Sequence, residues 1–354
     1  MATIHLNFRS DALWRSVYPL VFLPDLNGWR DADPPWPTLY FLNGYSGGGL
    51  ETAAFSNIAL FAMRYGVAVV LPDGDNSFYV DFPERRAMYS RYVGEELVEL
   101  TRSVLPLSRR REDTWIAGIS MGGYGALING LRFSERFSKI GMLSPALNFM
   151  REDGSLPPLG PEMRQELQSV FGSWEQYRDS YMNYWDVVPR MAAEGEPVPG
   201  MFLAVGEQDP LRPDVENFRL RVEQSGLPLT FYSREGGHDH TFWKKAMDPL
   251  FSFLTGKEDV WHVYEGHREI LLSAAGGGFS CHPARTGRVS RAARALPDAV
   301  FSSRILRQRG GDRFFPAPAP DGHTLWNGRR GSGRRKFILY GSSGAGFLSR
   351  TVCR

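Results

Sequence analysis

The chain has 354 residues, 42% of them apolar, and a formal net charge of +2. This length and this apolar content predict a globular protein with a substantial core and exclude a disordered or fibrous chain. The N-terminus has no basic flank before an apolar stretch, and Arg64 interrupts the longest apolar segment, so we expect a soluble protein without a membrane span that is not exported by the usual route. The only cysteines, Cys281 and Cys353, allow no disulfide framework or four-cysteine zinc site, which fits a cytoplasmic location.

Charge divides the chain into two unlike parts. Residues 1–255 carry a net charge of −8, which is typical of an ordinary globular domain and argues against nucleic acid as its partner. Residues 256–354 carry a net charge of +10 and mix glycine-rich pieces, a Pro-Ala run and scattered arginines. Such a segment could be a basic arm for nucleic acid or an anionic surface. The scattered arginines and the lack of an RNA-binding signature favour a weakly ordered or non-native extension instead.

Short apolar runs and helix-length segments alternate along residues 1–255. We predict strands at Val17–Leu23, Thr38–Leu42, Val67–Leu71, Thr114–Ile119, Ile140–Leu143, Met201–Val205 and Leu229–Tyr232. We predict helices at Phe55–Arg64, Tyr92–Val104, Met121–Phe133, Val215–Gln224 and Thr241–Leu254. This alternation predicts an α/β fold with a mainly parallel sheet flanked by helices, in which functional residues follow the carboxyl ends of the strands.

Residues 145–200 interrupt the alternation with a segment that is too short for a domain of its own. We predict a partial cap over the strand ends with one or two short helices. Its aromatic residues either line an acyl pocket or hold the cap down as buried anchors. They are Trp174, Tyr181, Tyr184 and Trp185, and Trp185 is our candidate substrate contact.

The stretch AGISMGGYGA contains the pattern G-x-S-x-G, from Gly118 to Gly122, between a predicted strand and a predicted helix. No lysine occurs between Ala62 and Arg132 and no G-x-G-x-x-G is spelled, which excludes both phosphate-binding loops. A strand that turns into a helix within about two residues strains its central residue, and glycine on each side leaves room for the backbones. The pattern predicts that Ser120 is an exposed nucleophile.

A serine hydroxyl needs a base and an orienting acid, which in this fold follow it in the order acid, then histidine. Asp209 follows the predicted strand at 201–205, and His238 follows the strand at 229–232 and a Gly-Gly pair. His240 is the alternative base. The alternative acids are Asp214 and Asp239, neither of which lies directly after the penultimate strand.

Two backbone amides are candidates for an oxyanion hole. The amide of Met121 follows the serine at the start of a helix, where a developing negative charge is stabilised. The second donor should come from the turn after an early strand, and LYFLNGYSGGG supplies the amide of Tyr45 after Asn43 and Gly44.

With these residues in place, the sequence from about Thr3 to Leu254 resembles the esterase D and tributyrin-esterase group of α/β-hydrolases, relatives of S-formylglutathione hydrolase and feruloyl esterases. The resemblance rests on LYFLNGYSGGG, VVLPDGDNSFYVDFP, GISMGGYGALINGLRFSERF, LAVGEQDPL and GGHDHTFWKKAM, in this order. It implies a cofactor-free serine carboxylesterase with no metal, and a loop at DNSFYVD in which Tyr79 touches substrate. Many members have His-Gly where this chain has Asn43-Gly44, and the tail after Gly256 has no counterpart in the group.

The sequence therefore predicts a serine carboxylesterase that hydrolyses small, short-chain acyl esters through Ser120, His238 and Asp209. Two alternatives stay open, namely an acyltransferase that uses the same residues and a catalytically silent binding module. The expected partner is a small-molecule ester, with neither nucleic acid nor membrane at the hydrolase domain, and the sequence leaves a homo-oligomer open.

Overall fold

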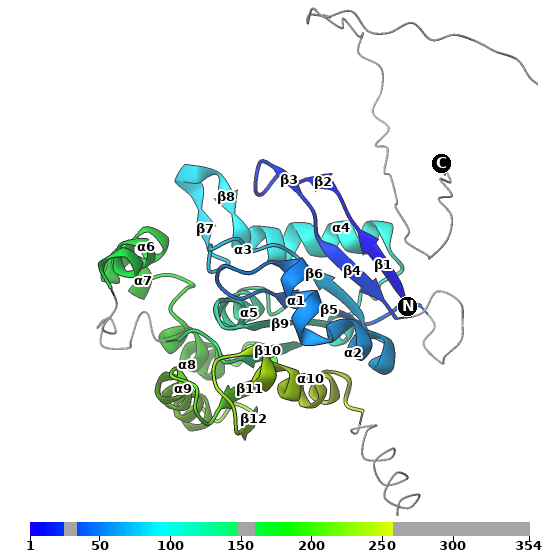
Figure 1. Ribbon diagram of the computed structural model, residues 1–354. Coiled ribbons are helices and arrows are strands. Elements are labelled where there is room, and N and C mark those ends of the chain that lie inside the picture. Colours follow the sequence, from blue (N-terminus) through cyan, green and yellow to red (C-terminus); the bar gives the residue numbers. More distant parts are fainter. Residues whose placement is uncertain (25–33, 148–159, 258–354) are drawn as a thin grey trace, which may run out of the picture. The chain divides into compact units, whose positions relative to one another are not determined.

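A computed structural model describes residues 1–24, 34–147 and 160–257 (Figure 1). Its main sheet confirms the predicted α/β-hydrolase architecture. In spatial order its eight strands are β1 (Ala2–His5), β4 (Leu20–Leu23), β6 (Ala68–Leu71), β5 (Thr38–Leu42), β9 (Thr114–Ile119), β10 (Lys139–Leu143), β11 (Gly200–Gly206) and β12 (Leu229–Arg234). The six strands from β6 to β12 run parallel, and β4 pairs antiparallel with both β1 and β6.

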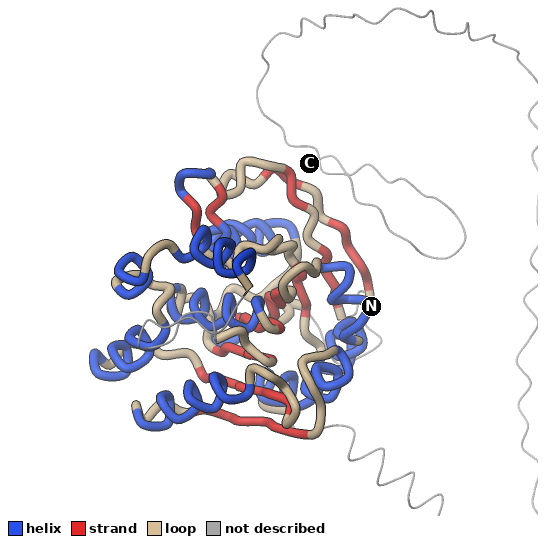
Figure 2. The backbone as a smooth tube through the Cα atoms, turned by 60° about the vertical axis from the view of Figure 1, so that its left-hand side comes forward, coloured by secondary structure: helices blue, strands red, loops and turns tan. Residues whose placement is uncertain are grey.

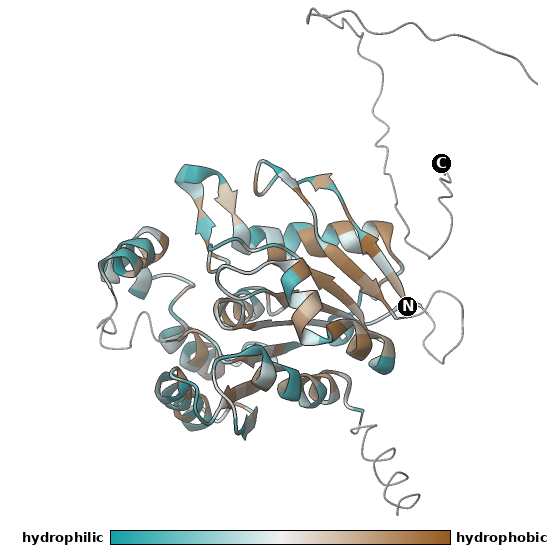
Figure 3. Ribbon diagram, viewed as in Figure 1, coloured by the Kyte–Doolittle hydropathy of each residue, from teal (hydrophilic) through white to brown (hydrophobic). Residues whose placement is uncertain are grey.

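Helices cover both faces of this sheet (Figure 2). One face packs against α1 (Gly49–Ser56), α2 (Ile58–Tyr65) and α10 (His240–Thr255). The other packs against α4 (Leu97–Val104), α5 (Met121–Arg132), α8 (Tyr184–Glu194) and α9 (Arg212–Gln224). Strand β5 shows why both faces are covered, because its side chains alternate between them. Leu39 and Phe41 pack under α1, α2 and α10, whereas Tyr40 and Leu42 pack on the opposite face. The central strands are accordingly largely apolar, and the polar faces of the helices point outward (Figure 3).

Several predicted elements are divided in the structure. The predicted helix at 55–64 is two helices, α1 and α2, separated by Asn57 in the left-handed conformation that asparagine tolerates. The predicted strand at 17–23 is broken at Pro19 into β3 (Ser16–Val17) and β4. The predicted helix at 92–104 begins earlier, as α3 (Tyr89–Arg91), and passes through a π-helical turn, η2 (Tyr92–Glu96), before α4.

Short elements that we did not predict complete the described chain. Strand β2 (Phe8–Arg9) pairs with β3, and β7 (Asp81–Phe82) pairs with β8 (Ala87–Met88). Two 3₁₀ turns, η1 (Pro83–Arg85) and η3 (Arg111–Asp113), precede β8 and β9. Within the described ranges no helix is both long enough and apolar enough to cross a bilayer.

The described part of the segment between β10 and β11 contains three helices rather than the one or two that we predicted. They are α6 (Pro161–Phe171), α7 (Trp174–Arg178) and α8. Gly172 and Ser173 separate the first two, since Gly172 has a φ of 72° and Ser173 caps α7 by accepting a hydrogen bond from the Gln176 amide. Of the predicted extension at 256–354, only residues 256 and 257 are described; the remainder, with both cysteines, lies outside the described residues.

Candidate active site

Ser120 lies at the turn between β9 and α5, with a φ of 54° and a ψ of −114°. A non-glycine residue is strained in this conformation, and it turns the chain from strand to helix at a single residue. A Cβ on Gly118 would lie 2.3 Å from the carbonyl oxygen of Gly122, and one on Gly122 would lie 2.3 Å from that of Leu42. The steric role that the sequence predicts for these two glycines is therefore confirmed.

His238 lies between Ser120 and Asp209. Its Nε2 atom is 2.9 Å from Ser120 Oγ, and its Nδ1 atom is 3.0 Å and 3.2 Å from the two carboxylate oxygens of Asp209. The loops after β11 and β12 hold this arrangement together, because the Gln208 amide donates to the Gly236 carbonyl and the Gly236 amide donates to the Gln208 side chain. The structure thus brings together the three residues that the sequence proposed as a triad.

The three alternative candidates have other positions. His240 is the first residue of α10, and its Nε2 atom faces Glu51 at 3.9 Å. Asp239 caps α10 by accepting hydrogen bonds from the Thr241 and Phe242 amides. Asp214 lies in the first turn of α9. None of the three takes the position that His238 or Asp209 occupies between β11 and β12.

Asp209 is surrounded by donors that favour its charged form. Burial alone would raise the pKa of this carboxyl group, but hydrogen bonds from His238, the Ser144 hydroxyl and the Leu211 amide together hold the pKa below its usual value. Asp209 therefore stays ionised beside the imidazole.

Ser144 is a residue of the site to which sequence reasoning gave no role. It is fully buried, it follows β10 with a φ of 46°, and its Oγ accepts a hydrogen bond of 3.0 Å from Trp243 Nε1. The indole of Trp243 packs edge-to-face with the imidazole of His238, with 5.1 Å between ring centroids. Ser144 thus links Trp243 to Asp209. Its position directly after a strand was the one sequence signal that it could belong to the site. Its partners come from distant parts of the chain, so the sequence did not indicate its contacts.

The turn that carries Tyr45 is fixed by the buried side chain of Asn43. The Asn43 amide group donates to the carbonyls of Gly44 and Gly47 at 2.8 Å and 2.9 Å, and its oxygen accepts from the Gly74 amide and the Tyr79 hydroxyl. All its hydrogen-bonding groups are satisfied, so asparagine suits this position.

The backbone amides of the two predicted oxyanion donors are unpaired among the described residues. Within the part of the chain that the structure describes, neither the Tyr45 amide nor the Met121 amide donates a hydrogen bond. The side chain of Tyr45 is engaged elsewhere, because its hydroxyl donates to Glu166 on α6 and so ties this turn to the cap.

The two predicted substrate contacts are not brought to the pocket. Tyr79 is fully buried, and burial raises the pKa of its hydroxyl well above the usual value, so it remains a neutral donor to Asn43. Trp185 is also buried and packs against Tyr184 and Phe218. In this conformation Tyr79 supports the Tyr45 turn, and Trp185 anchors the cap. Neither residue lines the pocket beside Ser120.

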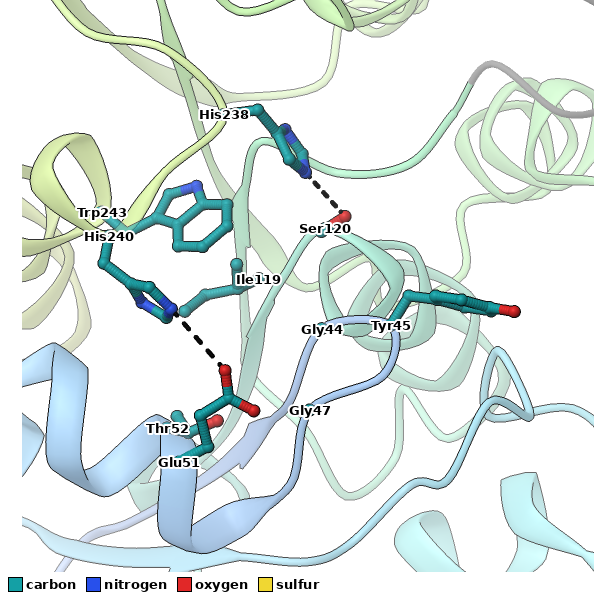
Figure 4. Close-up of a pocket in the computed structure, with 10 residues that line it drawn as sticks. All are labelled: Gly44, Tyr45, Gly47, Glu51, Thr52, Ile119, Ser120, His238, His240 and Trp243. Carbon is teal, nitrogen blue, oxygen red and sulfur yellow. Dashed lines mark hydrogen bonds and ion pairs between the residues drawn. The ribbon is translucent and has the colours of Figure 1, made fainter. Parts of the chain in front are cut away.

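A pocket of about 290 Å³ opens beside Ser120 (Figure 4). Apolar surface from Ile119 and Trp243 lies between its two polar ends. Ser120 and His238 form one end, and Glu51 and His240 face each other at the other. The pocket thus has a serine hydroxyl beside an imidazole at one end and a second pair of hydrogen-bonding side chains at the other.

Comparisons with known proteins agree with the fold. The chain is 34% identical over 270 residues to an acetyl esterase of Caldicellulosiruptor saccharolyticus, an alignment that covers 73% of this chain and all of that protein. It is 27% identical over 240 residues to an S-formylglutathione hydrolase of Bos taurus, covering 58% and 77% of the two chains. The solved fluorophosphonate-binding serine hydrolase F of Staphylococcus aureus has the same fold, with a TM-score of 0.62, 24% identity, and coverage of 72% of this chain and 98% of that one.

The family model named Esterase matches residues 10–254, which include all of the site. This match spans more than half of the chain, and it confirms the resemblance to the esterase D group that the sequence motifs carry. The chain therefore belongs to the Esterase family of the α/β-hydrolase fold and is a carboxylic ester hydrolase.

Proposed function

We propose that the chain hydrolyses short-chain acyl esters through a covalent acyl-enzyme on Ser120. The observation that carries this proposal is the relay in which His238 Nε2 lies 2.9 Å from Ser120 Oγ while its Nδ1 lies 3.0 Å from Asp209. Both distances are within the reach required of a nucleophile, its base and the residue that orients the base.

In the first half of the proposed reaction, His238 takes the proton of Ser120 as Oγ attacks the ester carbonyl. The resulting tetrahedral oxyanion receives hydrogen bonds from the amides of Tyr45 and Met121. His238 then gives the proton to the departing alcohol as the C–O bond breaks, which leaves the acyl group on Ser120. Asp209 stabilises the imidazolium that forms between these two proton transfers.

In the second half a water molecule replaces the alcohol. His238 removes a proton from this water as its oxygen attacks the acyl-enzyme, and it returns the proton to Ser120 Oγ as the carboxylic acid leaves. The apolar side chains of Ile119 and Trp243 beside the serine form a weakly polar wall, in which hydrogen bonds to the oxyanion are stronger than in water.

Two observations support a small acyl group. The pocket beside Ser120, which would hold the acyl and alcohol parts together, is about 290 Å³, at the lower end of the range for small-molecule sites. The protein from Caldicellulosiruptor saccharolyticus, which aligns with this chain over its full length, is an acetyl esterase. We therefore expect kcat/KM to be highest for acetyl esters in a series from acetyl to decanoyl, with S-formylglutathione and a feruloyl ester as comparison substrates.

Labelling with a fluorophosphonate probe tests the proposal directly. We expect one adduct on Ser120, located by mass spectrometry of the peptide, and no adduct after replacement of Ser120. A chain that takes up no probe and hydrolyses none of the esters is a silent binding module. Adding an acceptor alcohol to the ester assay tests the acyltransferase alternative, because a transferase would then release a new ester in place of the acid.

The turn at Asn43 gives a prediction for the oxyanion site. Asn43→Asp replaces the amide that donates to Gly44 and Gly47 with a carboxylate, which repels both carbonyls. Because Tyr45 follows in the same turn, we expect kcat to fall on the order of a hundredfold, as for loss of one oxyanion donor. Burst kinetics with p-nitrophenyl acetate measure the acylation rate, and an unchanged acylation rate in folded protein would contradict the prediction.

Ser144 gives a prediction for the acid of the relay. Ser144→Ala removes one donor to Asp209 and the acceptor of Trp243 Nε1, so the pKa of Asp209 should rise toward its usual value. We expect kcat/KM to fall about tenfold, by the cost of one hydrogen bond to a charged group, and the loss to grow at low pH. A pH–rate profile distinguishes this outcome from a uniform loss caused by misfolding.

A further inference from the structure

The end of the pocket opposite Ser120 carries two polar side chains that the reaction does not use. Glu51 lies in the first turn of α1 and His240 begins α10, and both line the pocket (Figure 4). Their nearest atoms, Glu51 Oε1 and His240 Nε2, are 3.9 Å apart, which is longer than a hydrogen bond. The two side chains therefore face each other without forming a direct hydrogen bond.

The carboxylate of Glu51 has unused acceptor capacity. Among the described residues it accepts no hydrogen bond, and its one ion-pair contact is the long one to His240. Its side chain is 47% exposed, so a ligand can reach it. A carboxylate has two oxygens, each able to accept more than one hydrogen bond, and it favours a donor from a substrate.

Two aromatic side chains pack against the ring of His240, and Nε2 is the ring nitrogen that faces the pocket. Phe55 packs against it at a tilt with ring centroids 4.9 Å apart, and Trp243 packs edge-on at 5.0 Å. Its Nδ1 atom is buried and has no hydrogen-bond partner in the described chain. A proton on Nε2 faces the Glu51 carboxylate and leaves the buried nitrogen bare, so this tautomer is the favoured one.

We propose that Glu51 and His240 form a subsite for a hydroxyl group of the substrate. A hydroxyl is both a donor and an acceptor, so it can donate to Glu51 Oε1 and accept from His240 Nε2–H in the same position. An alkyl group would leave both groups without a partner, a carboxylate would be repelled by Glu51, and an ammonium group has no acceptor for Nε2–H. A hydroxyl therefore fits the pair better than the other common groups.

This hydroxyl belongs to the alcohol part of the ester. The assignment rests on the proposed function, in which the acyl group is as small as acetyl. An acetyl group fills only a fraction of a pocket of about 290 Å³, and the remaining space leads from Ser120 past Trp243 to the Glu51–His240 end. The substrate class that follows is the acetate ester of a polyol or sugar, in which a free hydroxyl lies a few bonds from the ester oxygen.

The experiment compares matched acetate esters that differ only at the terminal group. The hydroxyl series is 2-hydroxyethyl, 3-hydroxypropyl and 4-hydroxybutyl acetate, the alkyl series is propyl, butyl and pentyl acetate, and the methoxy series is 2-methoxyethyl, 3-methoxypropyl and 4-methoxybutyl acetate. The methoxy esters have a similar inductive effect but lack the O–H donor. The rate of acetate release gives kcat/KM for each ester. Each value is then divided by the rate constant for hydrolysis of the same ester by hydroxide, which corrects for its intrinsic reactivity. We expect at least one hydroxyl ester to exceed both of its partners by roughly tenfold, the size of one hydrogen bond to a charged group.

Two variants assign that preference to the subsite. Glu51→Met keeps the length of the side chain without acceptors, and His240→Phe keeps the ring contacts without Nε2–H. We expect each to lower the ratio of kcat/KM for the hydroxyl ester to that for the alkyl ester toward one. Glu84→Gln, an exposed glutamate on η1, is the control and should leave the ratio unchanged.

Equal hydrolysis of the three series by the wild-type chain overturns the subsite, and so does a preference that survives both variants. A preference that appears instead with a hydroxyl on the acyl side, for ethyl glycolate over ethyl propanoate, overturns the assignment to the alcohol part. Failure of the proposed function looks different, because none of these esters would then be hydrolysed and Ser120 would take up no fluorophosphonate.

Discussion

Ser120→Ala is expected to lower kcat for p-nitrophenyl acetate on the order of a millionfold, to the residual rate that oxyanion binding alone supports. The substitution removes the oxygen that lies 2.9 Å from His238 Nε2, and the described pocket contains no second hydroxyl beside that nitrogen. Stopped assays with purified protein and a long incubation measure the residual rate, since contamination by wild-type enzyme sets the detection limit.

The control for this variant is the folded state. Alanine has the same Cβ as serine, so Gly118 and Gly122 accommodate it equally well. We expect circular dichroism and the thermal midpoint to match wild type within a few degrees. Wild-type turnover by folded Ser120→Ala would rule out the proposed nucleophile.

Asp209→Asn has the second largest expected effect, a loss of kcat on the order of ten-thousandfold. Asparagine has the size of aspartate, but its NH₂ group cannot accept the hydrogen from His238 Nδ1. The imidazole then adopts the other tautomer, with its proton toward Ser120 and no lone pair to act as base. The side chain of Asp209 is fully buried, so water cannot replace the missing acceptor.

Asp239→Asn is the matched control for this prediction. Asp239 is next to His238 in the sequence and its pKa is also lowered, chiefly by the Phe242 amide, but its carboxylate caps α10 and does not contact the imidazole. Asparagine is as good a helix cap as aspartate, so we expect less than a fivefold loss of kcat. Similar losses in the two variants would indicate a general structural effect and contradict the role proposed for Asp209.

Much of the candidate site could be predicted from sequence because its residues lie next to strong local signals. Ser120 lies inside a pattern whose glycines are required by backbone contacts. Asp209 follows the apolar strand β11, and His238 follows β12, which begins with the largely apolar run LTFY. In a parallel sheet, such strand ends meet at one edge whatever the intervening sequence does. The relative positions of the three therefore follow from topology, and the catalytic roles proposed for them stay predictions.

Residues whose positions depend on packing between distant segments could not be predicted in the same way. Tyr79 is buried because Gly74 and Gly125 leave room for its ring, since a Cβ on either glycine would lie within 2.4 Å of a tyrosine atom. Ser144 likewise acquires its role from Trp243, 99 residues later in the chain. Neither the packing of Tyr79 nor the hydrogen bond of Ser144 produces a periodic pattern of apolar residues in the sequence.

The cap shows the same limit in its local structure. Its helices are short, α8 contains Pro189, and α6 is largely polar, so periodicity is weak there. The boundary between α6 and α7 depends on one left-handed glycine and one serine cap, which a pattern of apolar residues does not reveal.

The glycine clearances around Ser120 also limit how this enzyme can be altered. A side chain added at Gly118 or Gly122 meets main-chain carbonyls of neighbouring segments, which cannot rotate away as a side chain can. A library of random substitutions at these two positions will therefore consist mostly of unfolded proteins. Glu51 and His240 are bordered largely by side chains and by the pocket itself, so new substrate preferences are best selected at that end, where variation leaves the backbone of the turn intact.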